Sequence, residues 1–135
     1  MFQEKEDLSK EPVRRKVLLL VEDDAAYAEY LVQLLQETPY HVFVATNSFA
    51  ALNFVKHIKP HLFILDYRLP DMNRLQLYTR LSFNRELSGI PILLLNACLE
   101  QCQDEIAARN LIALGKPFNP DTFLLTLKEM LTEVV

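Results

Sequence analysis

Short runs of apolar residues alternate along the chain with segments whose apolar residues recur at helical spacing. Continuous apolar runs of this length are typical of strands that are buried on both faces of a sheet. The predicted strands are residues 16–21, 40–45, 61–65, 90–95 and 111–114, and the predicted helices are residues 25–37, 48–58, 74–83, 100–109 and 121–134. This alternation predicts an α/β fold, a doubly wound five-stranded parallel sheet with five helices.

Individual residues mark the ends of several elements. Ser48 is the predicted N-cap of the second helix, and the triplet Asn119-Pro120-Asp121 supplies a cap, a first-turn proline and an early acid for the last helix. Residues 1–15 mix charges of both signs around Pro12 and predict a charged flexible tail. The remaining residues, 16–135, then form one domain.

Composition narrows the class of protein. The chain has 135 residues, half of them hydrophobic, and a formal net charge of −4, which argues against direct nucleic-acid binding. No apolar run approaches the roughly 20 residues that span a bilayer, and the charged N-terminus does not resemble a signal peptide, so we expect a cytoplasmic protein with no membrane partner. With only two glycines the chain has no glycine-rich phosphate loop, and its two cysteines, Cys98 and Cys102, have no nearby histidine and make a poor zinc site.

Polar residues follow the predicted strands at the point where each strand ends. Because the carboxyl ends of parallel strands lie along one edge of the sheet, we expect these residues to converge there. They are Glu22, Asp23 and Asp24 after the first strand, Asp66 after the third, Asn96 and Ala97 after the fourth, and Lys116 after the fifth.

The charges in this cluster indicate its chemistry. Two carboxylates about 4 Å apart repel by roughly 4 kcal/mol at an effective dielectric constant near 20. Glu22, Asp23 and Asp66 therefore require a cation, and Mg²⁺ fits because it accepts a few carboxylates and keeps several waters. With Lys116 and the Asn96 amide as further partners, the cluster predicts a site for a phosphoryl group with Asp66 as the covalent acceptor.

Four sequence motifs carry a family resemblance. They are "VLLLVEDD" at the first strand, "FILDYRLPDMN" at the third, "IPILLLNA" at the fourth and "GKPF" after the fifth. In this order and spacing the chain resembles a response-regulator receiver domain of bacterial two-component signalling over about residues 16–133. The resemblance implies a flavodoxin-like fold with strand order 2-1-3-4-5.

The resemblance also implies roles for individual residues. Asp66 would accept a phosphoryl group from a sensor histidine kinase or a phosphotransfer protein. Glu22, Asp23, Asp66 and the backbone carbonyl of Arg68 would bind Mg²⁺, and Lys116 would contact the phosphoryl oxygens. Catalysis would be limited to self-phosphorylation and self-dephosphorylation.

Three positions depart from the family pattern. Asn96, followed by Ala97, stands where the family usually has Thr or Ser, and Ala113 stands where it usually has Tyr or Phe. Arg74 replaces a glycine and predicts an altered or strained turn. These changes favour an alternative function, a pseudo-receiver that acts as a phosphorylation-independent interaction module, whereas the intact acidic residues and Lys116 favour the phosphorylated switch.

Other residues receive structural interpretations. Asp24 is predicted to start the first helix in contact with solvent, and Tyr27 and Tyr30 to pack or lie on the helix surface. By the resemblance, a homodimer would use the fourth helix, fifth strand and fifth helix, which include Asp104, Arg109 and Lys128. The output partner cannot be read from the sequence, and Met1 favours a stand-alone chain over a piece of a longer one.

Overall fold

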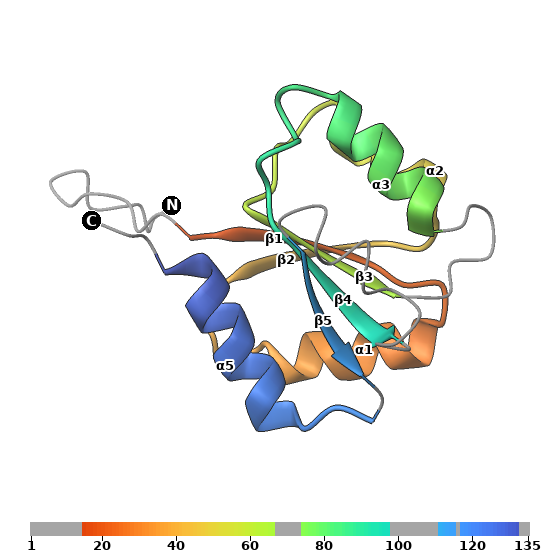
Figure 1. Ribbon diagram of the computed structural model, residues 1–135. Helices are drawn as coiled ribbons and strands as arrows, with labels where there is room; N and C mark the ends of the chain where they lie inside the picture. Colours follow the sequence, from red (N-terminus) through yellow and green to blue (C-terminus); the bar gives the residue numbers. More distant parts are fainter. Residues whose placement is uncertain (1–14, 67–73, 98–110, 116, 133–135) are drawn as a thin grey trace, which may run out of the picture.

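A computed structural model of the chain contains a five-stranded parallel sheet with helices on both faces (Figure 1). The structure describes residues 15–66, 74–97, 111–115 and 117–132. The strands are β1 (Val17–Val21), β2 (His41–Ala45), β3 (Leu62–Asp66), β4 (Ile92–Ala97) and β5 (Leu111–Gly115). The helices are α1 (Ala25–Leu34), α2 (Ser48–Phe54), α3 (Arg74–Phe83) and α5 (Pro120–Leu131).

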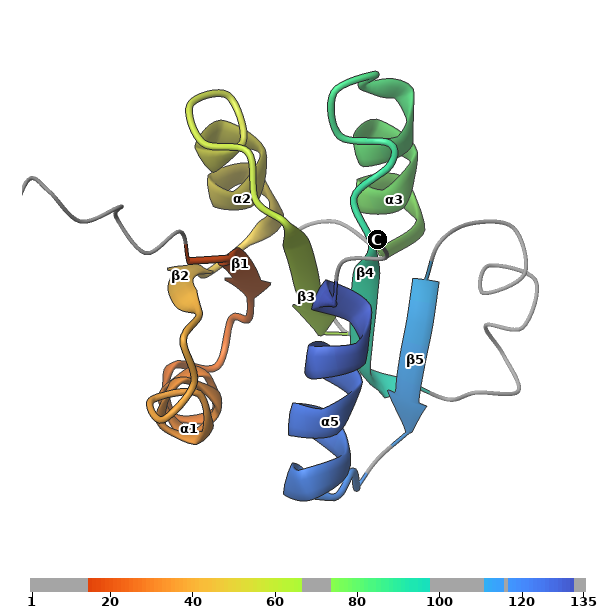
Figure 2. The same cartoon turned by 90° about the vertical axis from the view of Figure 1, so that its left-hand side faces the viewer.

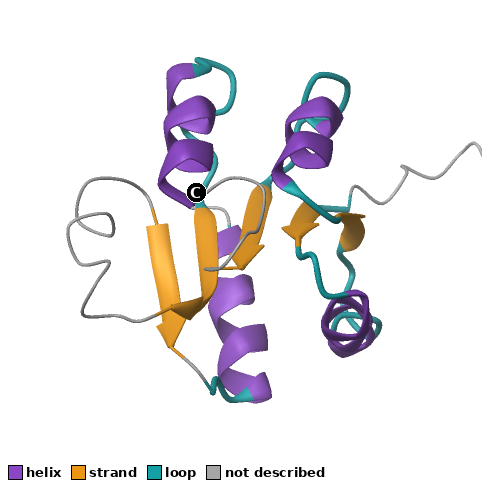
Figure 3. Ribbon diagram, turned by 90° about the vertical axis from the view of Figure 1, so that its right-hand side faces the viewer, coloured by secondary structure: helices purple, strands orange, loops and turns teal. Residues whose placement is uncertain are grey.

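The strand order is β2-β1-β3-β4-β5, which confirms the predicted topology. β1 and β3 are interior strands, and both are paired along their length. Figures 2 and 3 show α1 and α5 on one face of the sheet and α2 and α3 on the other. The helix predicted over residues 100–109 and most of the tail predicted over residues 1–15 fall outside the described residues, so four helices are described where five were expected.

Two apolar cores lie on opposite faces of the sheet, because neighbouring residues of a strand point to opposite sides. Alternate strand residues such as Leu19 and Phe63 pack with the α2 and α3 face, whereas Leu18 and Ile64 pack with α1 and α5. Burial on both faces explains why the strands read as continuous apolar runs. No helix in the described ranges has the length and apolar character needed to cross a membrane.

Several predicted boundaries were wrong. The cap of α2 is Asn47, whose Oδ1 accepts a hydrogen bond from the Ala50 N–H at 2.7 Å, and Ser48 is the first helical residue. α2 ends at Phe54, before the predicted Ile58, and the turn after it includes bonds to carbonyls three residues back, such as the 3.2 Å bond from Lys56 N to Asn53 O. By contrast, α3 begins at Arg74 as predicted, and the turn before it lies outside the described residues.

α5 has the predicted start. Asn119 is its cap, and the Asn119 Oδ1 accepts hydrogen bonds from Asp121 N at 2.7 Å and Thr122 N at 3.3 Å. Pro120 occupies the first turn, where its missing N–H costs nothing. Phe123, Leu127 and Leu131 are buried against the sheet.

Candidate functional site

Asp66 is the last residue of β3, and only 4% of it is exposed to solvent. Its Cα lies in register with that of Leu95 on β4, and β1 flanks β3 on the other side. A carboxyl group at this place is held by a strand that has neighbours on both sides. The interior of the sheet therefore fixes where Asp66 can present its oxygens.

Glu22 and Asp23 follow β1 directly. The Glu22 N–H continues the sheet by donating to the Ala45 carbonyl at 2.9 Å, and its side chain is 2% exposed, whereas Asp23 is exposed. Glu22 Oε2 accepts a hydrogen bond from the Asp24 N–H at 3.0 Å. The third acid, Asp24, caps α1 by accepting from Ala26 N at 3.0 Å and Tyr27 N at 3.1 Å, so its predicted place at the helix start is confirmed.

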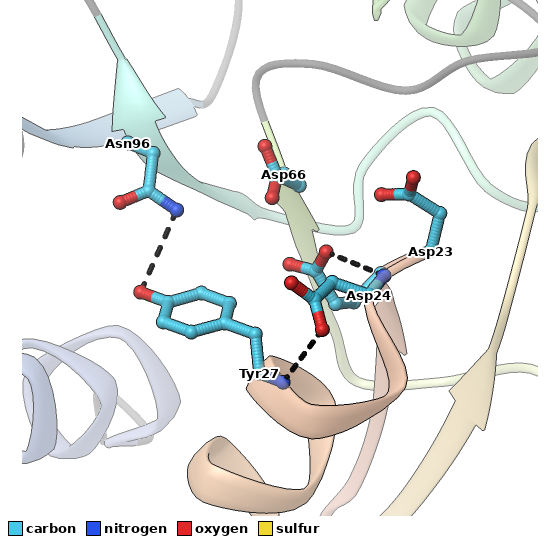
Figure 4. Close-up of a pocket in the computed structure, with 6 residues that line it drawn as sticks. Asp23, Asp24, Tyr27, Asp66 and Asn96 are labelled. Carbon is cyan, nitrogen blue, oxygen red and sulfur yellow. Dashed lines mark hydrogen bonds between the residues drawn. The ribbon is translucent and has the colours of Figure 1, made fainter.

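The structure brings three of the predicted acids together at this edge. Carboxylate oxygens of Glu22, Asp23 and Asp66 all lie within 4.8 Å of one another. They line an open pocket of about 430 Å³, whose full lining is Glu22, Asp23, Asp24, Tyr27, Asp66 and Asn96. Figure 4 shows the labelled side chains around the pocket, at the ends of β1, β3 and β4 and at the start of α1: Asp23, Asp24, Tyr27, Asp66 and Asn96.

The electrostatics of the pocket favour a cation. Burial, and then the neighbouring Asp66 carboxylate, raise the pKa of Glu22 from 4.5 to about 8. Glu22 Oε1 is buried and has no hydrogen-bond partner among the described residues. A buried oxygen without a partner beside two further carboxylates matches the hard oxygen ligands that Mg²⁺ prefers, so these residues fit that ion.

Asn96 lies inside β4, not after it as predicted, because β4 runs to Ala97. The pairing of β4 with β5 shifts between Leu95 and Ala97, and Asn96 adopts a positive φ of 61°. Asparagine tolerates this left-handed backbone better than most residues. The irregularity directs the Asn96 side chain to the pocket, where its Nδ2 donates to the Tyr27 hydroxyl at 3.5 Å.

Tyr27 lines the pocket, although only packing or a place on the helix surface was predicted for it. Its ring does pack against the core face of α1 and α5, and it stacks on Tyr30 with ring centroids 5.9 Å apart. It also lines the acidic pocket and a neighbouring cavity of about 300 Å³. The position three residues after a capping aspartate was the available clue, since it places a side chain beside the start of the helix.

Some predicted site residues cannot be placed. Arg68 and Lys116 fall outside the described residues, as do Asp104 and Arg109 of the predicted dimer face. Ala97 is the last residue of β4. Ala113 is half-buried in β5.

Comparison with known proteins agrees with this geometry. A family model described as the response regulator receiver domain matches residues 18–128. A solved structure of the chemotaxis response regulator CheY4 of Vibrio cholerae is 27% identical, with a TM-score of 0.79, and the match covers 87% of this chain and 100% of that one.

Two curated relatives are longer proteins. The phosphate regulon transcriptional regulatory protein PhoB of Pseudomonas aeruginosa is 31% identical over 120 residues, which cover 86% of this chain and 52% of PhoB. The probable transcriptional regulator ycf29 of Pyropia yezoensis is 29% identical over 121 residues, which cover 87% of this chain and 54% of ycf29. The chain thus spans about half the length of the curated relatives it matches.

Proposed function

The chain belongs to the response regulator receiver domain family, and from this premise we propose that it accepts a phosphoryl group on Asp66 and relays it as a signal. One observation carries the proposal: oxygens of Glu22, Asp23 and Asp66 lie within 4.8 Å of one another at the open end of the sheet. Such a cluster offers a nucleophilic carboxylate and two further ligands for a divalent ion.

The proposed reaction transfers the phosphoryl group from a phosphohistidine. An Asp66 carboxylate oxygen attacks phosphorus, the P–N bond breaks, and the imidazole leaves with the electron pair and takes up a proton. The product is a mixed anhydride between Asp66 and phosphate, and attack of water on phosphorus later releases inorganic phosphate and restores the carboxylate. Mg²⁺, bound by Glu22, Asp23 and Asp66, would neutralise charge on the transferring group.

Further groups complete the proposed site. The Arg68 carbonyl would be a fourth protein ligand of Mg²⁺, and Lys116 would contact phosphoryl oxygens as a point charge. The Asn96 amide would donate a hydrogen bond to the same oxygens, with the small side chain of Ala97 beside it. The pocket position of Asn96 supports its part in this assignment.

The test uses a small phosphodonor. Acetyl phosphate with Mg²⁺ should add one phosphoryl group, measured by intact-protein mass spectrometry, and chelation of Mg²⁺ should prevent it. Asp66→Asn should abolish the modification. Glu29→Gln is the matched control, because it removes one negative charge from an exposed position on α1 outside the pocket, and it should be modified like the wild type.

The pseudo-receiver function has one observation in its favour. Asn96, at the position where the family usually has a hydroxyl residue, has its amide engaged with Tyr27 and its backbone in the left-handed region. A chain that is folded and yet shows neither modification by acetyl phosphate nor Mg²⁺-dependent binding of beryllofluoride would act as a phosphorylation-independent interaction module.

The proposed partners follow from the reaction. The donor is a sensor histidine kinase or a phosphotransfer protein, and the transfer takes place in the cytoplasm. The match covers only about half of the relatives named as transcriptional regulators. We propose that the output belongs to a partner or to a further segment and not to direct nucleic-acid binding by this domain. A homodimer through the predicted fourth helix, β5 and α5 is a further proposal.

A further inference from the structure

The backbone at Asn96 departs from regular strand pairing, and this departure brings its side chain to the pocket. Asn96 is the one residue other than glycine with positive φ among the described residues, and it sits at the irregularity between β4 and β5. Irregularities of this kind redirect a side chain. Its carboxamide therefore reaches the acidic pocket from the β4 side, opposite the start of α1 (Figure 4).

A series of hydrogen bonds runs around the pocket to this carboxamide. Glu22 Oε2 accepts from Asp24 N at 3.0 Å, Asp24 Oδ1 accepts from Tyr27 N at 3.1 Å, and the Tyr27 hydroxyl accepts from Asn96 Nδ2 at 3.5 Å. The first two bonds fix the start of α1 relative to the acids. Among the described residues, Tyr27 is the one that hydrogen-bonds to the Asn96 side chain.

The Tyr27 ring is itself held in place. It is half-buried, stacks on Tyr30 at 5.9 Å, and forms part of the wall of two neighbouring cavities. Burial, with smaller contributions from the Glu22 and Asp66 carboxylates, raises the pKa of the Tyr27 hydroxyl above 10. The hydroxyl consequently stays neutral and accepts a hydrogen bond without adding charge to the pocket.

The orientation of the Asn96 carboxamide matters because its two ends differ. The NH₂ end donates hydrogen bonds, whereas the carbonyl oxygen only accepts them. An anionic phosphoryl group is attracted by the first and repelled by the second. In the structure Asn96 Nδ2 donates to the Tyr27 hydroxyl, so the nitrogen faces the pocket, and one N–H of that NH₂ remains for another acceptor.

We propose that Tyr27 is a positioning residue of the phosphoryl site, whose hydroxyl orients the Asn96 carboxamide so that its NH₂ end meets the phosphoryl oxygens on Asp66. The proposal rests on the function proposed above. It assigns no contact between Tyr27 and the phosphoryl group, because Tyr27 acts through Asn96.

The experiment measures the dissociation constant of beryllofluoride in saturating Mg²⁺ by NMR titration. Tyr27→Phe removes the hydroxyl and keeps the ring, and it should weaken binding about two- to five-fold, as expected for loss of one neutral hydrogen bond that orders a donor. Tyr30→Phe is the matched control: it removes a hydroxyl from the stacked neighbour, which does not line the acidic pocket, and it should bind like the wild type.

A double-mutant cycle separates positioning from a general structural effect. In the Asn96→Ala background, Tyr27→Phe should leave the dissociation constant unchanged, because the group that it orients is gone. The Asn96 side-chain NH₂ resonances, assigned by their loss in Asn96→Ala, should shift on beryllofluoride binding in the wild type and less in Tyr27→Phe.

The outcomes are distinguishable. The proposed function requires that the wild type bind beryllofluoride in the presence of Mg²⁺ and that Asp66→Asn abolish this binding. If either result is absent, the proposed function fails and the positioning role of Tyr27 fails with it. If the wild type binds beryllofluoride but the Tyr27→Phe variant binds it equally or more tightly, the proposed function stands and the role of Tyr27 is refuted. The same conclusion follows if Tyr27→Phe weakens binding to the same extent in the Asn96→Ala background.

Discussion

The burial of Glu22 predicts an unusual pH dependence of stability. With a pKa of about 8 in the folded protein and 4.5 as its ordinary value, the carboxyl keeps its proton in the folded state over a pH range in which the unfolded chain has lost it. The folded state binds more protons in this range, so stability must fall as the pH rises. Each pH unit is worth about 1.4 kcal/mol, and the loss from about pH 5 to about pH 8 is roughly 3 to 4 kcal/mol.

Glu22→Gln isolates this effect. The amide oxygen of glutamine can still accept the hydrogen bond from Asp24 N, which is 3.0 Å long in the wild type, but the side chain does not titrate. In a chelating buffer the variant should match the wild type within about 1 kcal/mol near pH 5 and exceed its stability by roughly 3 to 4 kcal/mol near pH 8. Urea unfolding followed by circular dichroism measures the free energies of unfolding.

Mg²⁺ should reverse the difference in stability between the wild type and Glu22→Gln. Binding of the ion requires the ionised carboxylate and stabilises the folded state by mass action, so it should flatten the pH dependence of the wild type. Calorimetric titration of Mg²⁺ near pH 6.5 in buffers of different ionisation enthalpy should detect about one proton released per ion by the wild type and none by Glu22→Gln.

Glu29→Gln is the control, since Glu29 is exposed on α1 and outside the pocket. Its replacement removes one negative charge, as Glu22→Gln does for the ionised carboxylate. The reasoning is refuted by a stability difference between wild type and Glu22→Gln that stays constant with pH, or by an equal pH-dependent gain in Glu29→Gln.

Two further predictions concern the cap and the packing of α5. Asn119→Ala should lower the free energy of unfolding by about 1 kcal/mol, because the Asp121 and Thr122 N–H groups lose their cap, and an unchanged urea midpoint would contradict this. Phe123→Ala should cost about 3 to 5 kcal/mol because Phe123 is fully buried, whereas Leu125→Ala, at a position 56% exposed on the same helix, should change stability by less than about 0.5 kcal/mol in the same assay.

The meeting of Glu22, Asp23 and Asp66 could be foreseen from the sequence because it depends only on topology. Each acid ends or follows an apolar strand, and parallel strands bring those ends to one edge. Neither the exact pairing register nor the packing of side chains is needed for this inference. The strand order itself came from the family resemblance and not from the apolar runs.

The Asn96–Tyr27 contact could not be foreseen, because it depends on details that a one-residue shift would remove. β4 continues beyond the predicted Leu95 to Ala97, and the irregular pairing with β5 decides where the Asn96 carboxamide points. Apolar patterning ends at Leu95 and carries no information about the polar residues that extend the strand. The prediction of Ser48 as the cap of α2 was wrong for a similar reason. Asn47 and Ser48 are both good capping residues, and only the hydrogen bond from Ala50 N identifies Asn47 as the cap.

The rigidity of the sheet explains how a cluster that lowers stability would also favour a divalent ion. Acids on a mobile surface separate by rotation and lose most of their repulsion to water. Here Glu22 and Asp66 are buried at the ends of β1 and β3, each paired on both sides, so their backbones cannot move apart without breaking sheet hydrogen bonds. Relief must then come from solution, as a proton on Glu22 or as a divalent ion among the three carboxylates. Burial and then the neighbouring Asp66 carboxylate raise the Glu22 pKa. Because a proton and Mg²⁺ would compete for the same oxygens, the repulsion from Asp66 would also favour the ion once the proton leaves.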